Sequence, residues 1–182
     1  MAEFLPGSAV ECEKGPQFID TLFELTGGIG LSQMTEITGL PASTVQNWVK
    51  RGWVPSPHGK KYGKRALCRV LIINSLRGCM QLADIILLMS YINGEVNNEA
   101  DDIIEDRTLY NMLCEADKLI KSQSAGLDEY PAVADSLLAN YGGSDSNRKR
   151  LHNALVIMLM SMTATDIVSR VGGLINQLKE VE

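Results

Sequence analysis

The sequence predicts a mainly α-helical protein, and three observations point to this fold class. Apolar residues recur at intervals of three and four over most of the chain, which is the period of an amphipathic helix. Strand-like alternation of apolar and polar residues is nearly absent, and aromatic residues are few. With 182 residues, the chain can bury a core in one domain, or hold one small domain with a helical extension.

Glycine and proline mark where the expected helices begin and end. Pro16 suits the first turn of a helix that carries apolar residues from Phe18 to Leu25, and the glycines that follow end it. Ser32 is the expected N-cap of a two-turn helix that Gly39-Leu40-Pro41 stops. Further helices are expected over residues 42–51, 64–78, 82–92 and 102–121, in a short stretch ending at 140, and over 147–180, where glycines 172 and 173 would allow a bend.

Charge is distributed unevenly along the chain. Residues 1–36 hold six acids and one base, and residues 95–182 hold fifteen acids and eight bases. From Ile37 to Ala83 there are eight bases and no acid, so this block carries +8 in a chain whose net charge is −5. Such a block is typical of a surface that contacts a phosphate backbone, and a chance run is the alternative.

Composition argues against membrane and secreted proteins. The longest apolar run, Ala154 to Met160, is shorter than the roughly 20 residues that cross a bilayer. The first fifteen residues lack the basic start and apolar core of a secretory signal. The cysteines at 12, 68, 79 and 114 have no paired spacing, so thiols in a reducing cytoplasm are a simpler interpretation than disulfides or a zinc site. We therefore expect a cytoplasmic protein without membrane association, metal or cofactor.

Residues 31–51 have the pattern of a helix-turn-helix, in which a three-residue turn joins two helices. In the second helix, Val45, Trp48 and Val49 form one apolar stripe. The stripe can pack on apolar residues of the first helix and the turn, namely Met34, Ile37 and Leu40. A helical hairpin with a polar outer face and no ligand is the alternative explanation.

The other side of the second helix is polar and basic. It carries Ser43, Gln46, Asn47 and Lys50, with Thr44 and Arg51 on its flanks. Gln and Asn amides can bond an adenine edge, hydroxyls reach bases or phosphates, and Lys and Arg neutralise phosphates. This is the composition that a recognition helix in the major groove of DNA needs.

The run from Leu31 to Pro55 has a distinctive spacing, with the Ser43-Thr44 pair, an aromatic residue four positions later, Gly52 and a closing proline. The run resembles the DNA-binding domain of MerR-type regulators and keeps the spacing of that domain without an insertion or deletion. The later Gly-Lys-Lys-Tyr, residues 59–62, resembles the tip of their wing, where a basic pair and a tyrosine meet the DNA backbone. Residues 76–77 and 82–85 resemble the two helices that close the domain. The short wing and the segment from Tyr62 to Arg77 resemble those of a bacterial family filed only as a domain of unknown function.

The resemblance implies a winged helix-turn-helix DNA-binding domain over residues 31–94. Residues 1–30 would then form an N-terminal arm and helix, and residues 95–182 an acidic, all-helical C-terminal region for dimerisation or sensing. The residues expected on DNA are Ser43, Thr44, Gln46, Asn47, Lys50, Arg51, Lys60, Lys61, Tyr62, Lys64 and Arg65.

The chain also departs from the MerR pattern. Gln46-Asn47 stand where those regulators usually carry Arg followed by an aromatic, so their base preferences do not carry over. The wing, Pro57 to Tyr62, is shorter. The C-terminal region lacks both their long antiparallel dimer helix with a metal loop and their aromatic-rich drug-binding domain, so their effectors do not carry over either.

Two further groups of residues have simple explanations. The acids Asp101, Asp102, Glu105 and Asp106 lack the alternating ligands and central glycine of a calcium loop. They are expected to stabilise a helix N-terminus and to face water. Cys68 lies in an apolar helix and is expected to be buried rather than to act as a metal or redox sensor.

The run Ala154 to Met160 is apolar on all sides of a helix, so it must be buried within this subunit or against another. The apolar pattern continues to Leu178. Of these two possibilities we favour a dimer interface.

Together these observations predict a bacterial-type, sequence-specific transcription regulator that binds double-stranded DNA as a homodimer. Helix 43–51 would enter the major groove, and the short basic wing would hold phosphates. An effector is left open. The alternative function is a helical protein-interaction adaptor that uses the same basic hairpin to bind an acidic partner. An enzyme is disfavoured, because no nucleophile–base pair, phosphate loop or metal-ligand cluster is evident.

Overall fold

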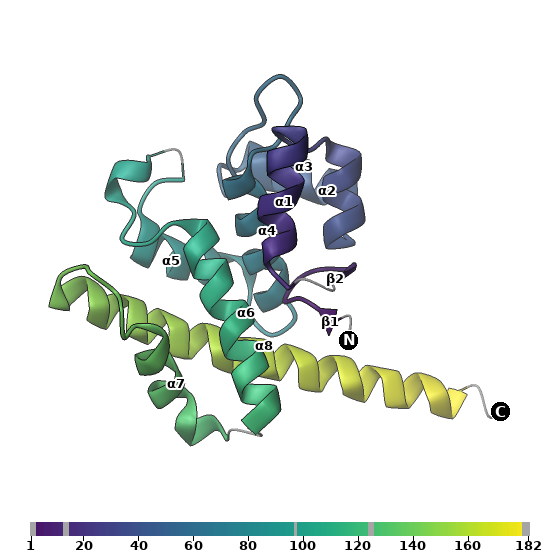
Figure 1. Ribbon diagram of the computed structural model, residues 1–182. Coiled ribbons are helices and arrows are strands. Elements are labelled where there is room, and N and C mark those ends of the chain that lie inside the picture. The colour runs from purple at the N-terminus through teal and green to yellow at the C-terminus, as the bar shows by residue number, and fades with distance from the viewer. Residues whose placement is uncertain (1–2, 13–14, 97, 124–125, 180–182) are drawn as a thin grey trace.

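The fold is mainly helical, as the sequence predicts (Figure 1). It is given by a computed structural model that describes residues 3–12, 15–96, 98–123 and 126–179. Two-residue strands β1 (Glu3–Phe4) and β2 (Glu11–Cys12) pair antiparallel near the N-terminus. The α-helices are α1 (Gln17–Thr26), α2 (Leu31–Thr38), α3 (Ala42–Lys50), α4 (Lys64–Leu76), α5 (Leu82–Asn93), α6 (Asp106–Gln123), α7 (Tyr130–Leu137) and α8 (Asp145–Lys179), and short 3-10 turns cover Glu99–Asp101 and Leu127–Glu129.

Helices α2 and α3 are joined by the turn Gly39–Pro41 and pack on each other. Gly39 adopts a left-handed conformation with φ 68°, which glycine tolerates because it has no Cβ. The predicted stripe of α3 faces inward: Val45 and Trp48 are buried and Val49 is half-buried. Their predicted neighbours are buried as well, namely Met34, Ile37 and Leu40.

The start of α2 differs from the prediction. Gly30, not Ser32, is the N-cap, and its backbone N–H donates to Oε1 of Gln33 at 3.0 Å. Leu31 is already helical, so Ser32 lies inside the first turn and is exposed. The side chain of Gln33 therefore satisfies an N-terminal backbone group.

Helix α4 is the centre of the molecule. Nearly all of its residues from Ala66 to Leu76 are buried, because α1, α2, α5, α6 and α8 all pack on it. A helix surrounded in this way has little need of a polar face. Buried residues from Leu5 to Met162 form one continuous core around it.

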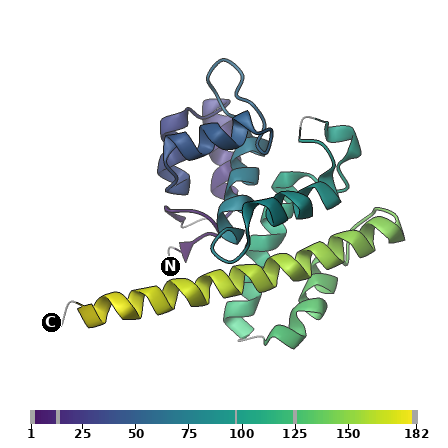
Figure 2. The same ribbon diagram turned by 180° about the vertical axis from the view of Figure 1, so that it is seen from behind.

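Helix α8 runs the length of the molecule, with α7 on one side and most of the other helices on the opposite side, and its C-terminal part continues beyond them (Figures 1 and 2). Its first half packs on α4, α5, α6 and α7. It passes Gly172 and Gly173 without interruption. The predicted helix end at Glu180 lies outside the described residues.

The apolar run of α8 is divided between core and surface. Leu155, Met158 and Leu159 are buried within the chain, whereas Ile157 and Met160 are 44% and 41% exposed. By length and composition α8 could cross a membrane, with only 28% of its most apolar window buried, and no other helix among the described residues meets that test. The uninterrupted apolar run from Ala154 to Met160, on which the prediction against a membrane helix rested, is shorter than this 18-residue window. A core helix of a soluble protein meets the same test, so the finding alone assigns no membrane.

Candidate nucleic-acid interface

The polar side of α3 faces solvent. Ser43, Gln46, Asn47 and Lys50 are exposed along it, and Thr44 is half-buried. The helix can present these side chains together because its opposite side is fixed in the core by Val45 and Trp48. The outcome is a surface of hydroxyl, amide and ammonium groups on one rigid element.

Arg51 follows α3 and is held in place by two contacts. Its Nε donates to Oδ1 of Asn47 at 3.3 Å, and its guanidinium lies 5.0 Å from the centroid of the Trp53 ring. A cation at this distance from an aromatic face is attracted by the ring quadrupole. Asn47 and Arg51 therefore form one hydrogen-bonded pair in the free protein.

Next to α3, residues 58–61 form a tight hairpin. His58 and Lys61 exchange two backbone hydrogen bonds of 2.9 Å. Between them, Gly59 and Lys60 have φ values of 54° and 67°, the pair of positive angles that a type I′ turn requires. Lys60 is the one non-glycine residue with positive φ in the part of the chain that the structure describes. The hairpin carries Lys60 and Lys61 exposed at its tip.

The base of this hairpin is fixed to the segment after α1. Tyr62 and Ile29 exchange backbone hydrogen bonds of 2.7 and 3.1 Å. The Nζ of Lys61 donates to the carbonyl of Thr26 at 3.0 Å, near the C-terminus of α1, where a cation is favourable. These hydrogen bonds fix the position of the hairpin relative to the end of α1.

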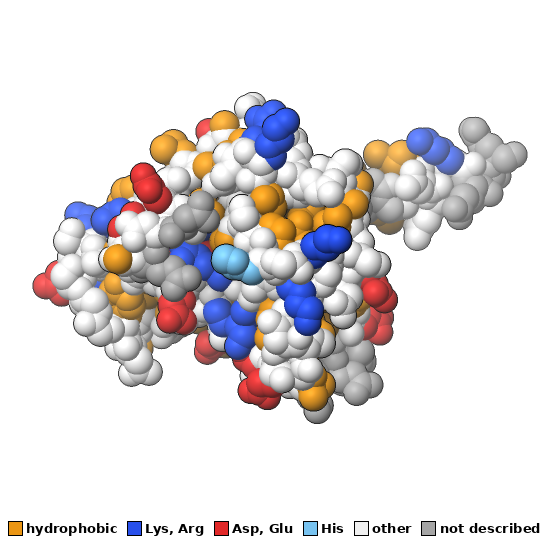
Figure 3. Space-filling view, turned by 90° about the horizontal axis from the view of Figure 1, so that it is seen from above, with side chains coloured by type: hydrophobic (Ala, Val, Ile, Leu, Met, Phe, Trp, Pro, Cys, Tyr) orange, Lys and Arg blue, Asp and Glu red, His pale blue; other side chains and the backbone are white. Residues whose placement is uncertain are grey.

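Figure 3 looks down on the end of the molecule that carries the hairpin. Lys and Arg side chains gather there around a histidine, and acidic side chains lie mostly toward the edges. A cleft of about 560 Å³ opens beside the hairpin. Its described lining includes His58, Lys61 and Arg65 and no carboxylate. This face is suited to an anionic partner.

Three of the predicted site residues lie in other surroundings. The Tyr62 side chain is in the core, 4% exposed, and burial raises its pKa. Lys64 forms an ion pair with Asp20 at 2.8 Å. Arg65 pairs with Asp102 at 2.9 Å and with Asp106 at 3.1 Å. Within the described part of the chain, the α3 residues and the hairpin lysines are therefore not paired with an acid, whereas the side chains of these three residues are buried or paired with an acid, although Arg65 also lines the cleft beside the hairpin.

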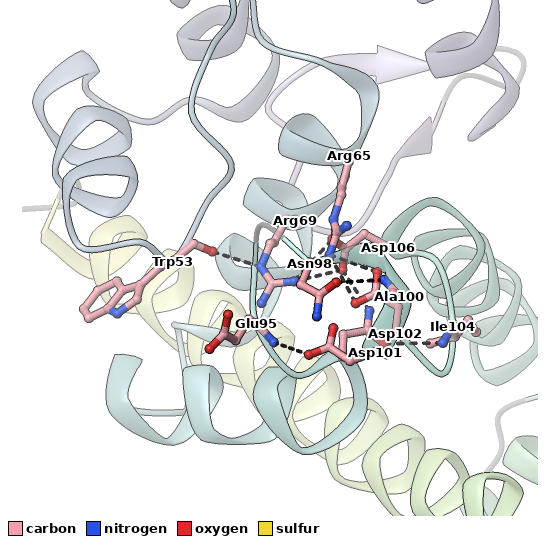
Figure 4. Close-up of polar contacts among 11 residues, drawn as sticks. Trp53, Arg65, Arg69, Glu95, Asn98, Ala100, Asp101, Asp102, Ile104 and Asp106 are labelled. Carbon is pink, nitrogen blue, oxygen red and sulfur yellow. Dashed lines mark hydrogen bonds and ion pairs between the residues drawn. The ribbon is translucent and has the colours of Figure 1, made fainter.

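Sequence reasoning missed a buried ion network behind this surface (Figure 4). Arg69 and Asp106 are both fully buried, with Nη1 of Arg69 3.3 Å from Oδ2 of Asp106. Nδ2 of Asn93 donates to Oδ1 of the same carboxylate at 3.3 Å. The Nε of Arg69 donates to the carbonyl of Trp53 at 2.9 Å, just after α3. Helices α4, α5 and α6 thus meet at one carboxylate, and Arg69 links it to the segment that follows α3.

The expectation that the acids near 101–106 face water is wrong for two of them. Asp106 is 1% exposed, and Asp102 is paired with Arg65. The pKa of Asp102 is raised, mainly because the carboxyl group is partly buried. The signal available in the sequence was Arg69, a charge inside the apolar run of α4, because a buried charge needs a partner.

A second charged cluster joins α1 to α6. Asp20 accepts hydrogen bonds from Arg107 at 2.5 Å and from Lys64 at 2.8 Å. These bonds, first from Arg107 and then from Lys64, lower the pKa of Asp20 to about 2. Arg107 also donates to the carbonyl of Pro16 at 3.0 Å. The cluster fixes the start of α1 against the C-terminal region.

The buried cysteines and the possible metal ligands are the other groups that bear on chemistry in the described part of the chain. Burial raises the pKa of Cys68 and of Cys114 to about 12, so both thiols stay protonated at neutral pH and are poor nucleophiles. Within residues 3–12, 15–96, 98–123 and 126–179, no group of three or more His, Cys, Asp or Glu side chains could hold a metal ion.

Fold and surface together define a mainly helical protein with a polar and basic helix beside a basic hairpin. The chain belongs to the family described as Domain of unknown function (DUF1836), whose model matches residues 18–113. The matched span runs from α1 into α6, so it includes the α3 surface, the hairpin and the buried ion network. Comparison with curated proteins found no match, and neither did comparison with solved structures. The predicted membership of an uncharacterised family is confirmed, and the MerR resemblance stays a prediction.

Proposed function

We propose that this protein is a sequence-specific DNA-binding regulator of transcription that uses a MerR-like winged helix-turn-helix. In this proposal α3 is the recognition helix, α2 its supporting helix and the 58–61 hairpin the wing. The observation that carries it is the exposed polar face of α3 beside two exposed hairpin lysines, within a 47-residue block of eight bases and no acid.

The roles divide by chemistry. Gln46 and Asn47 carry amides that can read base edges in the major groove. Lys50, Lys60 and Lys61 are point charges suited to phosphates. Asn47 already accepts a hydrogen bond from Arg51, so reading a base would require this pair to rearrange.

The structure narrows the set of side chains on which the proposal rests. Lys64 forms an ion pair with Asp20, and Arg65 forms ion pairs with Asp102 and Asp106. Tyr62 contributes through its backbone, which anchors the hairpin, rather than through a buried hydroxyl. We therefore assign DNA contact to α3 and to the hairpin tip.

The test separates base reading from phosphate binding. Sites would be selected from random DNA, and binding then titrated at several salt concentrations on a selected and a scrambled duplex. Gln46→Ala or Asn47→Ala should weaken the selected site by roughly 1–3 kcal/mol and leave scrambled DNA nearly unchanged.

The lysines should behave differently. Lys60→Gly with Lys61→Ala should weaken both duplexes alike and flatten the log–log salt dependence by about 0.9 per lost phosphate contact. Glycine is chosen at 60 because φ there is 67°, where alanine would add strain. Lys149→Ala with Lys179→Ala removes the same charge from exposed positions elsewhere and should leave the slope unchanged.

The same titrations distinguish DNA binding from the alternative function, a protein-interaction adaptor. DNA binding would be rejected if the protein bound neither duplex at low salt but was retained on an acidic protein matrix, and if this retention was lost when the hairpin lysines were replaced. A change of preferred sequence by the lysine pair would reverse the roles assigned here.

A further inference from the structure

The outer part of α8 carries an exposed apolar stripe with a regular spacing. Its residues alternate steps of three and four over three heptads, and we call them the α8 seam: Ile157, Met160, Ala164, Ile167, Val171, Leu174 and Leu178. Ala164 is half-buried, and the exposed fraction of the other members ranges from 41% at Met160 to 72% at Leu178. Val168 and Ile175, 59% and 47% exposed, widen one edge.

The seam faces away from the rest of the chain. Met158 and Met162 are buried against the body, and with about 3.6 residues per turn the seam lies on roughly the opposite side of α8. Asp166 and Ser169, on the body side, line a cleft together with Asn74. From Ile167 onward, no described part of this chain covers the seam.

The seven-residue repeat indicates what would cover it. Apolar residues spaced by three and four over at least three heptads are typical of a helix that packs lengthwise on another helix. The repeat keeps the contact on one side of both helices, which a partner of irregular shape would not require.

We propose that the partner is a second copy of this chain, with the two α8 seams packed on each other. Charge supports this choice. Between Ala154 and Leu178 the only charged residues are Asp166 and Arg170, and they pair with each other at 2.9 Å. Two copies therefore bring a neutral surface together, without like-charge repulsion or a buried unpaired charge. The inference is independent of DNA binding.

A lipid bilayer fits the seam less well. A helix that spans lipid is apolar on all sides, whereas the body side of this segment carries Thr165, Asp166 and Ser169. A helix that lies in the membrane surface usually has a polar face rich in Lys and Arg. Here that face has one arginine, already paired.

The experiment measures the mass of the full chain in solution. Sedimentation or light scattering would follow the wild type and two variants at about 50 µM, where a micromolar dimer is well populated. Leu174→Glu places a carboxylate in the seam. Asn176→Glu places the same group two residues later, near the body side. Both native side chains are exposed, so neither variant removes a core contact, and circular dichroism would check folding.

The wild type and Asn176→Glu should have the mass of a dimer, and Leu174→Glu should raise the dissociation constant by at least about tenfold. A monomeric wild type would overturn the proposal. So would a dimer that Leu174→Glu leaves intact, because another surface would then hold it. Flotation with phosphatidylglycerol–phosphatidylcholine vesicles adds the remaining arm: seam-dependent binding of a monomer to vesicles would assign the seam to membrane instead.

Discussion

At the scale of single residues, Trp48 decides whether α3 keeps its orientation. Its side chain is 2% exposed, while Gln46 and Asn47 beside it in sequence are exposed. The tryptophan therefore fixes which side of α3 reaches solvent. The exposure of Gln46 and Asn47 therefore depends on a buried residue.

Trp48→Ala should destabilise the fold by about 3–5 kcal/mol, because it leaves a large cavity in the core. Such a loss is much of the free energy of unfolding of a typical domain. Urea denaturation followed by circular dichroism would measure it. Trp53→Ala is the matched control, since Trp53 is only half-buried, and it should cost clearly less. Equal losses would mean that Trp48 does not hold α3.

At the scale of elements, the carboxylate of Asp106 joins helices that are distant in sequence. It contacts Arg65 and Arg69 of α4 and Asn93 of α5, and it begins α6. Through Arg69 it is linked to the carbonyl of Trp53, close to the proposed recognition helix. A change in α6 can therefore reach the α3 segment through one side chain.

Asp106→Asn should lower the free energy of unfolding by about 3–5 kcal/mol, because it leaves the Arg69 charge buried and uncompensated. Chemical denaturation at neutral pH would test this. Glu105→Gln, the same change at the neighbouring exposed position, should stay within about 0.5 kcal/mol of the wild type. If the two variants lose similar amounts, the network does not stabilise the helix contacts.

At the scale of the whole molecule, the N-terminal segment is tied to the C-terminal region. Arg107 of α6 bonds Asp20 and the carbonyl of Pro16, and the Tyr110 hydroxyl donates to the carbonyl of Pro6 at 2.9 Å. One core runs from Leu5 to Met162, so the N-terminal segment and the first half of α8 stabilise the same body.

The Asp20 cluster makes part of this stability depend on pH. The pKa of Asp20 falls from 3.8 to about 2 on folding, so its contribution is present above pH 4 and is lost as the pH drops toward 2. Asp20→Asn should therefore destabilise the protein most near neutral pH, and its difference from the wild type should shrink between pH 5 and pH 3. Urea midpoints across this range would show it, with Glu24→Gln, exposed on the same helix, as control. A difference that does not vary with pH would contradict the ion-pair explanation.

The helices and the inward stripe of α3 could be predicted from the amino-acid sequence. Both follow from local periodicity, because side chains three and four apart share a helix face whatever lies beyond it. The membership of an uncharacterised family was also readable, since it depends on the linear order of residues.

Which basic side chains are available to a partner depends on how distant elements pack, and this could not be predicted from the sequence. Lys64, Arg65 and Arg69 belong to the same basic block as Lys60 and Lys61, yet the first three are paired with acids at least 37 positions away. The same holds for α8, whose apolar residues read alike in the sequence but divide into a buried side and an exposed seam. Periodicity reports that a face is apolar, whereas the packing of distant elements determines which neighbour, if any, covers it.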